Sequence, residues 1–279
     1  MKQDYQYKTS RGHSIPVTRY GKGEFGHRPC VLYIHGFKGF KDWGFVPHLA
    51  QRISLAGLDV ITFNFSHNGI GPDGQSFTEL DAFSKNSLSL EKEEAIELIR
   101  LVAFSDFFGG HLLQPLGVLG HSRGGGIALL ASASSEEVQA VCTWASVSTF
   151  DRYSKTQMNT WKQQGYHEVI NSRTGQKLIL GPEMLSDLEK NAKTTLNILQ
   201  ATRQLGKPLQ IIHGQADETV PCFEAEQLNI FADPTKSDLK LIPDGTHTFG
   251  AKHPFEGESI PLGLAIDASI TFFTQQLRQ

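Results

Sequence analysis

The sequence predicts an α/β protein built on a mostly parallel, doubly wound sheet. Short apolar runs rich in β-branched residues alternate with amphipathic segments along most of the 279 residues. The apolar runs are continuous rather than alternating, as expected for strands that are buried on both faces of a sheet. The length is sufficient for a large core, and we expect one domain over residues 1–279.

The N-terminal half begins with a hairpin. Residues 4–9 and 14–20 alternate in polarity around Ser-Arg-Gly-His, which predicts an antiparallel hairpin at the edge of the sheet. Buried strands are predicted within 30–35 (CVLYIH) and 58–65 (LDVITFNF), with an amphipathic helix at 46–57 between them. A loop at 66–76, rich in Gly, Ser and Asp, precedes a predicted helix at 88–104 with its charges on one face.

The C-terminal half continues the alternation after one interruption. Strands are predicted at 115–121, 138–146, 208–214 and 239–243, and helices at 123–134, 222–232 and 261–277. Residues 150–195 break the pattern, and 167–172 and 176–180 form a small predicted hairpin around Arg-Thr-Gly. An insertion between core strands is typical of a lid, so we expect an inserted cap at about 150–195.

Composition excludes several classes of protein. The formal net charge of −3 gives no basis for binding nucleic acid or an anionic membrane. The N-terminus lacks the apolar core of a signal peptide, and no apolar run approaches a membrane span. Cys30, Cys142 and Cys222 are far apart and odd in number, which indicates neither a disulfide framework nor a zinc site. We therefore expect a cytoplasmic protein that acts on a small molecule without a metal or organic cofactor.

The candidate nucleophile is Ser122, in the Gly-His-Ser-Arg-Gly-Gly stretch at 120–125. A predicted strand runs into this serine and a predicted helix follows it, as in a nucleophile elbow, where Gly120 and Gly124 relieve crowding. A serine hydroxyl needs a base, and the base needs an orienting acid. In this arrangement the chain order is serine, acid, histidine.

Two later loops supply the partners in that order. Asp217 follows the strand at 208–214, and His247 follows the last strand. Both lie at carboxyl ends of strands, where open α/β sheets bind their ligands. The His-Gly-Phe at 35–37 fits an oxyanion loop, in which the backbone N–H of Phe37 joins that of Arg123 and Gly36 permits close approach.

The motifs HGFKG (35–39), GHSRGG (120–125), HGQADETVP (213–221) and DGTHTF (244–249) resemble those of serine hydrolases of the α/β-hydrolase fold. The similar branch contains dienelactone-hydrolase-like proteins, feruloyl and cinnamoyl esterases and prolyl-oligopeptidase-like domains. This resemblance implies a sheet of about eight strands and supports the Ser122–Asp217–His247 triad. Dienelactone hydrolases proper use a cysteine nucleophile, so Ser122 favours the esterase-like members. The inserted hairpin resembles the small caps of feruloyl esterases.

Several residues compete for these roles. Asp151 is a rival acid after the preceding strand, and Asp187, in a predicted cap helix, is a weaker one. Among the 11 histidines, His35 and His213 end strands and are expected to orient loops, while His121 is expected at the floor of the site and His253 near its mouth. Trp161 and Tyr166, together with Tyr153, either form an aromatic wall of the substrate pocket or pack the cap onto the body. Arg173 lies in a hairpin turn and is expected to be solvated.

The resulting expectation is hydrolysis of a carboxylic ester, of short-chain or aromatic acyl type, through an acyl-enzyme. The alternatives are a peptidase or amidase with the same triad, a thioesterase or acyltransferase, and a non-catalytic binding protein that keeps the fold. Prolyl-oligopeptidase relatives carry a large propeller domain that this sequence does not contain, which disfavours a peptidase of that kind. Non-catalytic proteins of the fold commonly lose a triad residue, so the presence of all three disfavours that alternative.

Overall fold

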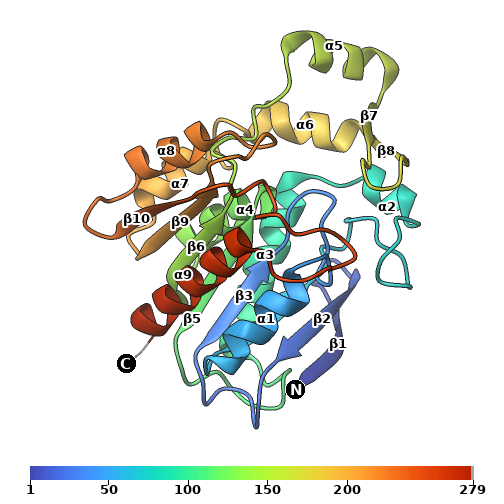
Figure 1. Ribbon diagram of the computed structural model, residues 1–279. Helices are drawn as coiled ribbons and strands as arrows, with labels where there is room; N and C mark the ends of the chain where they lie inside the picture. The colour runs from blue at the N-terminus through green and yellow to red at the C-terminus, as the bar shows by residue number, and fades with distance from the viewer. Residues whose placement is uncertain (278–279) are drawn as a thin grey trace.

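An eight-stranded sheet forms the centre of the structure, a computed structural model that describes residues 1–277 (Figure 1). Its strands are β1 (Lys2–Lys8), β2 (Ser14–Tyr20), β3 (Cys30–Ile34), β4 (Asp59–Phe63), β5 (Leu116–His121), β6 (Val138–Trp144), β9 (Leu209–Gly214) and β10 (Ser237–Ile242). The spatial order is β1-β2-β4-β3-β5-β6-β9-β10. β1–β2 and β2–β4 pair antiparallel, and the other neighbours are parallel. The predicted hairpin and mostly parallel sheet are confirmed.

Helices cover both faces of the sheet. One face carries α1 (Val46–Leu55) and α9 (Ile260–Gln276), and the other carries α3 (Leu88–Phe104), α4 (Arg123–Ala133), α7 (Ile198–Gln204) and α8 (Cys222–Phe231). In β3, Val31 and Tyr33 face the first layer, whereas Leu32 and Ile34 face the second. Both side-chain directions are buried, so the strand is apolar throughout its length.

The interruption in the alternation contains α5 (Lys155–Gln164), β7 (His167–Ile170), β8 (Lys177–Leu180) and α6 (Pro182–Asn191). Figure 1 shows this segment beyond one end of the sheet, beside the short helix α2 (Leu80–Ser84). β7 and β8 form the predicted hairpin. α5 was not predicted, although Ser154 and Gln157 form a capping box at its start and this pattern is visible in the sequence.

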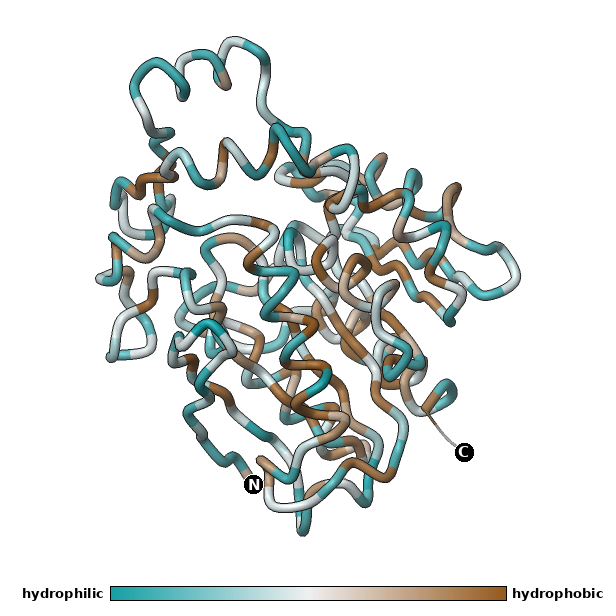
Figure 2. The backbone as a smooth tube through the Cα atoms, turned by 180° about the vertical axis from the view of Figure 1, so that it is seen from behind, coloured by the Kyte–Doolittle hydropathy of each residue, from teal (hydrophilic) through white to brown (hydrophobic). Residues whose placement is uncertain are grey.

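The inserted segment is anchored by buried side chains. Trp161 of α5 is fully buried, and Leu178 and Leu180 of β8 join the same hydrophobic cluster as the body of the protein. The Gly181 N–H also donates to the Ser84 carbonyl oxygen, at 2.7 Å. Figure 2 shows hydrophobic residues along the central strands and their helices, whereas the chain around α5 is mostly hydrophilic. Among residues 1–277, no helix has the length and apolarity needed to cross a membrane.

Candidate active site

Ser122 occupies a tight turn between β5 and α4. Its φ of 57° and ψ of −123° lie outside the regions that L-residues ordinarily adopt. A Cβ atom added at Gly120 would lie 2.2 Å from the Gly124 carbonyl oxygen, and one at Gly124 would lie 2.4 Å from the Ile34 carbonyl oxygen. Larger residues at these two positions would force the turn apart, which explains the glycines on either side of the serine.

The structure brings Ser122, His247 and Asp217 together. His247 Nε2 lies 2.9 Å from Ser122 Oγ, and His247 Nδ1 lies 2.8 Å from Asp217 Oδ2. The histidine comes from the loop after β10, and the aspartate from the loop after β9. With Nδ1 protonated, the ring donates to Asp217 and accepts the serine proton at Nε2. This tautomer can remove a proton from the serine hydroxyl.

Asp217 is held as a charged acceptor. Its Oδ1 accepts hydrogen bonds from the N–H groups of Thr219 and Val220, at 2.8 and 2.9 Å. Burial alone would raise the pKa of this carboxyl, but hydrogen bonds from His213 and His247 outweigh that effect and hold the pKa below its ordinary value. The side chain has no exposed surface, whereas that of His247 is 20% exposed. The acid therefore lies behind the base, away from solvent.

The loop after β3 lies against the serine. A Cβ atom at Gly36 would lie 3.0 Å from Ser122 Cβ and 2.9 Å from the His121 carbonyl oxygen, so this backbone makes the close approach expected of an oxyanion loop. Within residues 1–277, the N–H groups of Phe37 and Arg123 donate to no other protein group. Both residues line the space around Ser122. The two donors are available to a negatively charged oxygen of a substrate.

The side chain of Arg123 stabilises the same loop, a role that was not predicted from the sequence. Its guanidinium lies 3.9 Å from the centroid of the Phe37 ring and 3.4 Å from Glu91 Oε1 of α3. Burial raises the pKa of Glu91, and the charge of Arg123 opposes that rise. Asn86 Nδ2 also donates to this carboxylate, at 2.8 Å. No local motif marks Glu91, because it meets Arg123 only through the packing of α3 on α4.

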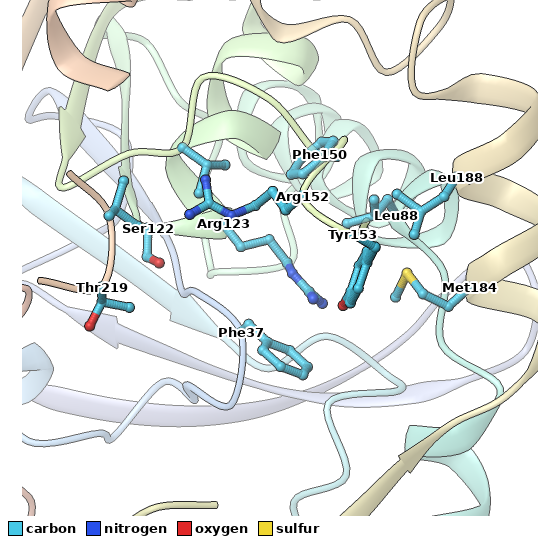
Figure 3. Close-up of a pocket in the computed structure, with 12 residues that line it drawn as sticks. Phe37, Leu88, Ser122, Arg123, Phe150, Arg152, Tyr153, Met184, Leu188 and Thr219 are labelled. Atoms are coloured by element: carbon cyan, nitrogen blue, oxygen red, sulfur yellow. The ribbon is translucent and has the colours of Figure 1, made fainter. Parts of the chain in front are cut away.

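Two cavities flank Ser122. The first, of about 270 Å³, is lined mainly by apolar side chains: Phe37, Leu88, Ser122, Arg123, Val147, Phe150, Arg152, Tyr153, Met184, Leu188, Thr219 and Val220. Figure 3 shows Ser122 and Thr219 at one end of it and Met184 and Leu188 at the other. The second, of about 350 Å³, lies on the His247 side and includes Lys38, His121, Asn171, Ser172 and Arg173. Ser122 borders both cavities, so each cavity opens onto the serine hydroxyl.

Sequence comparisons give only distant relatives. No protein-family model matches the chain. Two curated proteins from Escherichia coli, each described as an uncharacterized 31.7 kDa protein in the traX-finO intergenic region, are 25% identical to it over 179 residues, or 64% of this chain. The match spans 57% of the length of these relatives.

Solved structures resemble nearly the whole chain. Dienelactone hydrolase from Anabaena variabilis matches with a TM-score of 0.65 at 17% identity, covering 99% of each chain. Est1E from Butyrivibrio proteoclasticus, solved with ferulic acid, matches with a TM-score of 0.70 at 18% identity, covering 97% of this chain and 98% of Est1E. Mouse alpha/beta hydrolase domain-containing protein 10 matches with a TM-score of 0.73 at 17% identity, covering 98% and 99%. The chain has the α/β-hydrolase fold. The resemblance drawn from the motifs is confirmed at the level of the fold.

The rival acids serve other purposes within the hydrolase fold. Asp187 accepts from the N–H and the hydroxyl of Ser89, at 2.8 and 2.5 Å, and so caps the start of α3. Asp151 is half-exposed and lies 4.0 Å from Lys193 Nζ. Neither residue lines the cavities at Ser122. Of the three candidate acids, Asp217 is the one that the structure places against His247.

The other histidines support loops of the hydrolase fold, as expected for His35 and His213. His35 Nδ1 lies 2.9 Å from the Gly36 carbonyl oxygen, and its Nε2 accepts from the Phe65 N–H at 3.2 Å. His213 Nε2 lies 2.8 Å from the Val220 carbonyl oxygen. His121 lines the second cavity, with Nε2 2.9 Å from the carbonyl oxygen of His247. Burial lowers the pKa of His35 to about 4 and that of His121 to about 3, so both are neutral at pH 7.

The expected aromatic wall needs correction. Trp161 is fully buried, donates from Nε1 to the Gly181 carbonyl oxygen at 3.2 Å and stacks on His167, so it packs the inserted segment and does not line a cavity at Ser122. Tyr166 is 41% exposed and lines neither cavity. Tyr153 does line the first cavity. Arg173 is exposed as expected, but it also borders the second cavity.

One cluster has the side chains of a metal site. His13, His67 and Glu94 place ligand atoms within 4.8 Å of one another. Glu94 and His67 are already hydrogen-bonded to Ser66. None of these residues lines the cavities at Ser122, so we assign the cluster no part in the chemistry.

Proposed function

We propose that this protein is a serine hydrolase of carboxylic esters that acts through an acyl-enzyme. One observation carries the proposal: His247 lies between Ser122 Oγ and Asp217 Oδ2, at 2.9 and 2.8 Å. This geometry supports a nucleophile, a general base and an orienting acid in one hydrogen-bonded line. The ester hydrolases among the structural neighbours are consistent with this proposal. The proposed reaction is argued from the positions of the three side chains, not from those neighbours.

The reaction divides into two steps. Ser122 Oγ attacks the ester carbonyl carbon while its proton passes to His247 Nε2, and the carbonyl oxygen becomes an oxyanion facing the N–H groups of Phe37 and Arg123. His247 returns the proton to the leaving oxygen as the carbon–oxygen bond breaks. Water then attacks the acyl-enzyme by the same route, releasing the acid and restoring Ser122. Asp217 fixes the tautomer of His247 and stabilises its positive charge.

The two cavities receive different halves of the ester. His247 must reach the leaving oxygen to protonate it, and this histidine lines the second cavity but not the first. We therefore assign the leaving group to the second cavity and the acyl group to the first. We call these the leaving-group cavity and the acyl cavity. The apolar lining of the acyl cavity by Leu88, Phe150, Met184 and Leu188 favours an apolar or aromatic acyl group of moderate size.

Hydrolysis of activated esters tests this function. We expect turnover of 4-nitrophenyl esters, with kcat/KM varying with the size and aromaticity of the acyl group. Ser122→Ala should lower kcat by on the order of 10⁶, because the remaining two residues cannot supply a nucleophile. The matching amides and thioesters, measured in parallel, rank the three kinds of bond. If Ser122→Ala retains more than about a tenth of the activity, Ser122 does not carry the reaction.

A further inference from the structure

The two cavities at Ser122 differ in how their positive charges are neutralised. In the acyl cavity, Arg123 lies 3.4 Å from Glu91 and Arg152 is ion-paired with Glu224. Glu91 and Glu224 are both buried. Each cation of the acyl cavity therefore has a carboxylate partner, and this side of the site carries no net positive charge from its arginines.

The leaving-group cavity has two cations without such partners. Lys38 and Arg173 line it, and among residues 1–277 neither lies within 4.0 Å of a carboxylate oxygen. Lys38 Nζ donates instead to the carbonyl oxygen of Ile170, at 2.9 Å. No aspartate or glutamate borders this cavity in the described part of the chain. Asp217 is shielded behind His247, and the neighbouring Glu218 is exposed and not part of the lining.

A buried donor without an acceptor lies in the same cavity wall. Asn171 is 6% exposed, and its Oδ1 accepts from the Arg173 N–H at 3.2 Å, which fixes the orientation of the amide. Its Nδ2 is buried and has no hydrogen-bond partner. An unsatisfied buried donor costs free energy unless a ligand or water accepts from it. Asn171 lines the leaving-group cavity, so the missing acceptor can come from a bound leaving group.

We propose that the leaving-group cavity binds an anionic leaving group, an alcohol or phenol that carries a carboxylate or phosphate, through Lys38, Asn171 and Arg173. The proposal rests on the proposed ester hydrolysis and adds a substrate class to it. The three side chains come from two separate segments, the oxyanion loop and the β7–β8 turn. The Lys38–Ile170 hydrogen bond joins these segments, so the inserted hairpin completes the site.

The backbone at Lys38 supports a role for its side chain. Its φ of 58° places a non-glycine residue in the left-handed region, where lysine is uncommon. Glycine or asparagine would adopt this conformation more readily. The position thus combines an unfavourable backbone with a cationic side chain next to Phe37, whose N–H faces the reacting carbonyl in the proposed reaction.

Three acetate esters with one acyl group test the proposal. The probes are 4-acetoxybenzoate, 4-acetoxyphenyl phosphate and the uncharged 4-acetoxybenzamide. We expect the wild-type protein to hydrolyse an anionic ester with a higher kcat/KM than the amide-bearing ester, through KM more than kcat. The two anionic probes distinguish carboxylate from phosphate recognition. The preference should decrease between 0.05 and 1 M salt, because screening weakens partly exposed charge pairs.

Substitutions test which side chains cause the preference for anionic esters. Arg173→Gln and Lys38→Asn should each lower the ratio of anionic to neutral kcat/KM by about three- to tenfold, as expected of partly exposed ion pairs. Asn171→Asp keeps the Oδ1 acceptor for the turn but replaces the donor with a negative charge, and should lower the ratio further. Arg173→Lys should restore part of it. Lys177→Gln is the matched control, because it removes one charge from the same hairpin outside the cavity lining and should leave the ratio unchanged.

The outcomes separate the two proposals. If the protein hydrolyses the neutral ester as well as the anionic ones, the anionic leaving group is overturned and ester hydrolysis stands. The same holds if Lys177→Gln reduces the preference for anionic esters as much as Arg173→Gln does. Failure to hydrolyse any of the three esters, with Ser122 also unreactive, overturns the proposed function and this inference with it. A preference lost in Arg173→Gln and Asn171→Asp, and retained in Lys177→Gln, supports the site.

Discussion

Ser122 shows how a single residue can be positioned against its own conformational preference. A φ of 57° with a ψ of −123° is a sparsely populated conformation that costs a non-glycine residue roughly 1–3 kcal/mol. The cost is tolerated because β5 and α4 fix the chain on both sides and the adjacent glycines remove steric conflict. In this conformation the Oγ of Ser122 faces His247, and the N–H of Arg123 lies at the start of α4, where backbone donors have no partner within the helix.

The choice of acid gives a direct prediction. Asp217→Asn should lower kcat by on the order of 10⁴, because an amide at this position no longer fixes the tautomer of His247 that accepts the serine proton. Asp151→Asn is the matched control, since Asp151 lies at the surface near Lys193 and should change kcat by less than about twofold. Steady-state kinetics on one activated ester measure both. A larger loss in the Asp151 variant would assign the acid to the loop after β6.

Single residues also mark where prediction from sequence was limited. Ser122, Asp217 and His247 were predictable, because each follows a recognisable strand and their chain order is set by the fold. The roles of Glu91, Asn171 and the Arg123 side chain were not predictable, since they come from contacts between segments that are distant in sequence. Trp161 was ambiguous for the same reason: a large aromatic in an insertion can line a pocket or pack the insertion, and only its burial decides.

The secondary-structure elements that form the central sheet or pack on it were predicted best, because burial gives them a clear apolar pattern. The helix at 88–104 has the predicted bounds, and the central strands lie within their apolar runs. α5 was not predicted, and the helix around Asp187, now α6, was expected without bounds, because both sequences are polar and only one side of each helix is buried. α6 places Met184 and Leu188 in the acyl cavity, so the insertion contributes directly to the proposed site.

The end of β3 leads to a prediction about pH. Burial lowers the pKa of His35 to about 4, from an ordinary value of 6.5. As the pH falls below 6.5 the unfolded chain takes up this proton first, so stabilisation that is present above pH 6.5 is lost toward pH 4. This one residue should lower the free energy of unfolding by about 2 kcal/mol between pH 7 and pH 5.

Urea unfolding at pH 7 and pH 5 measures this contribution. In His35→Asn the loss of stability between the two pH values should be smaller than in the wild type by about the same amount, since no imidazole remains to be protonated. His27→Asn changes an exposed histidine in the same way and should keep the wild-type difference. An equal pH dependence in the wild type and His35→Asn would contradict a buried neutral His35.

Across the chain, the sequence was sufficient for the α/β-hydrolase fold because the same alternation of strands and helices recurs on both sides of the insertion. The parallel strands place the loops after β3, β5, β9 and β10 at one edge of the sheet, and these loops supply Phe37, Ser122, Asp217 and His247. The charge difference between the two cavities was not predictable from this alternation, because it depends on which arginines form ion pairs with Glu91 and Glu224.

Reaction with a fluorophosphonate tests the proposed Ser122–His247–Asp217 chemistry most directly. The probe forms a stable bond with a serine oxygen when a neighbouring base removes its proton, so no physiological substrate is needed. We expect one adduct per chain by intact mass, located on the peptide that contains Ser122, with labelling abolished in Ser122→Ala and slowed at least 100-fold in His247→Ala. No adduct in folded protein, or an adduct that persists in Ser122→Ala, would contradict the assignment of Ser122 as the activated nucleophile.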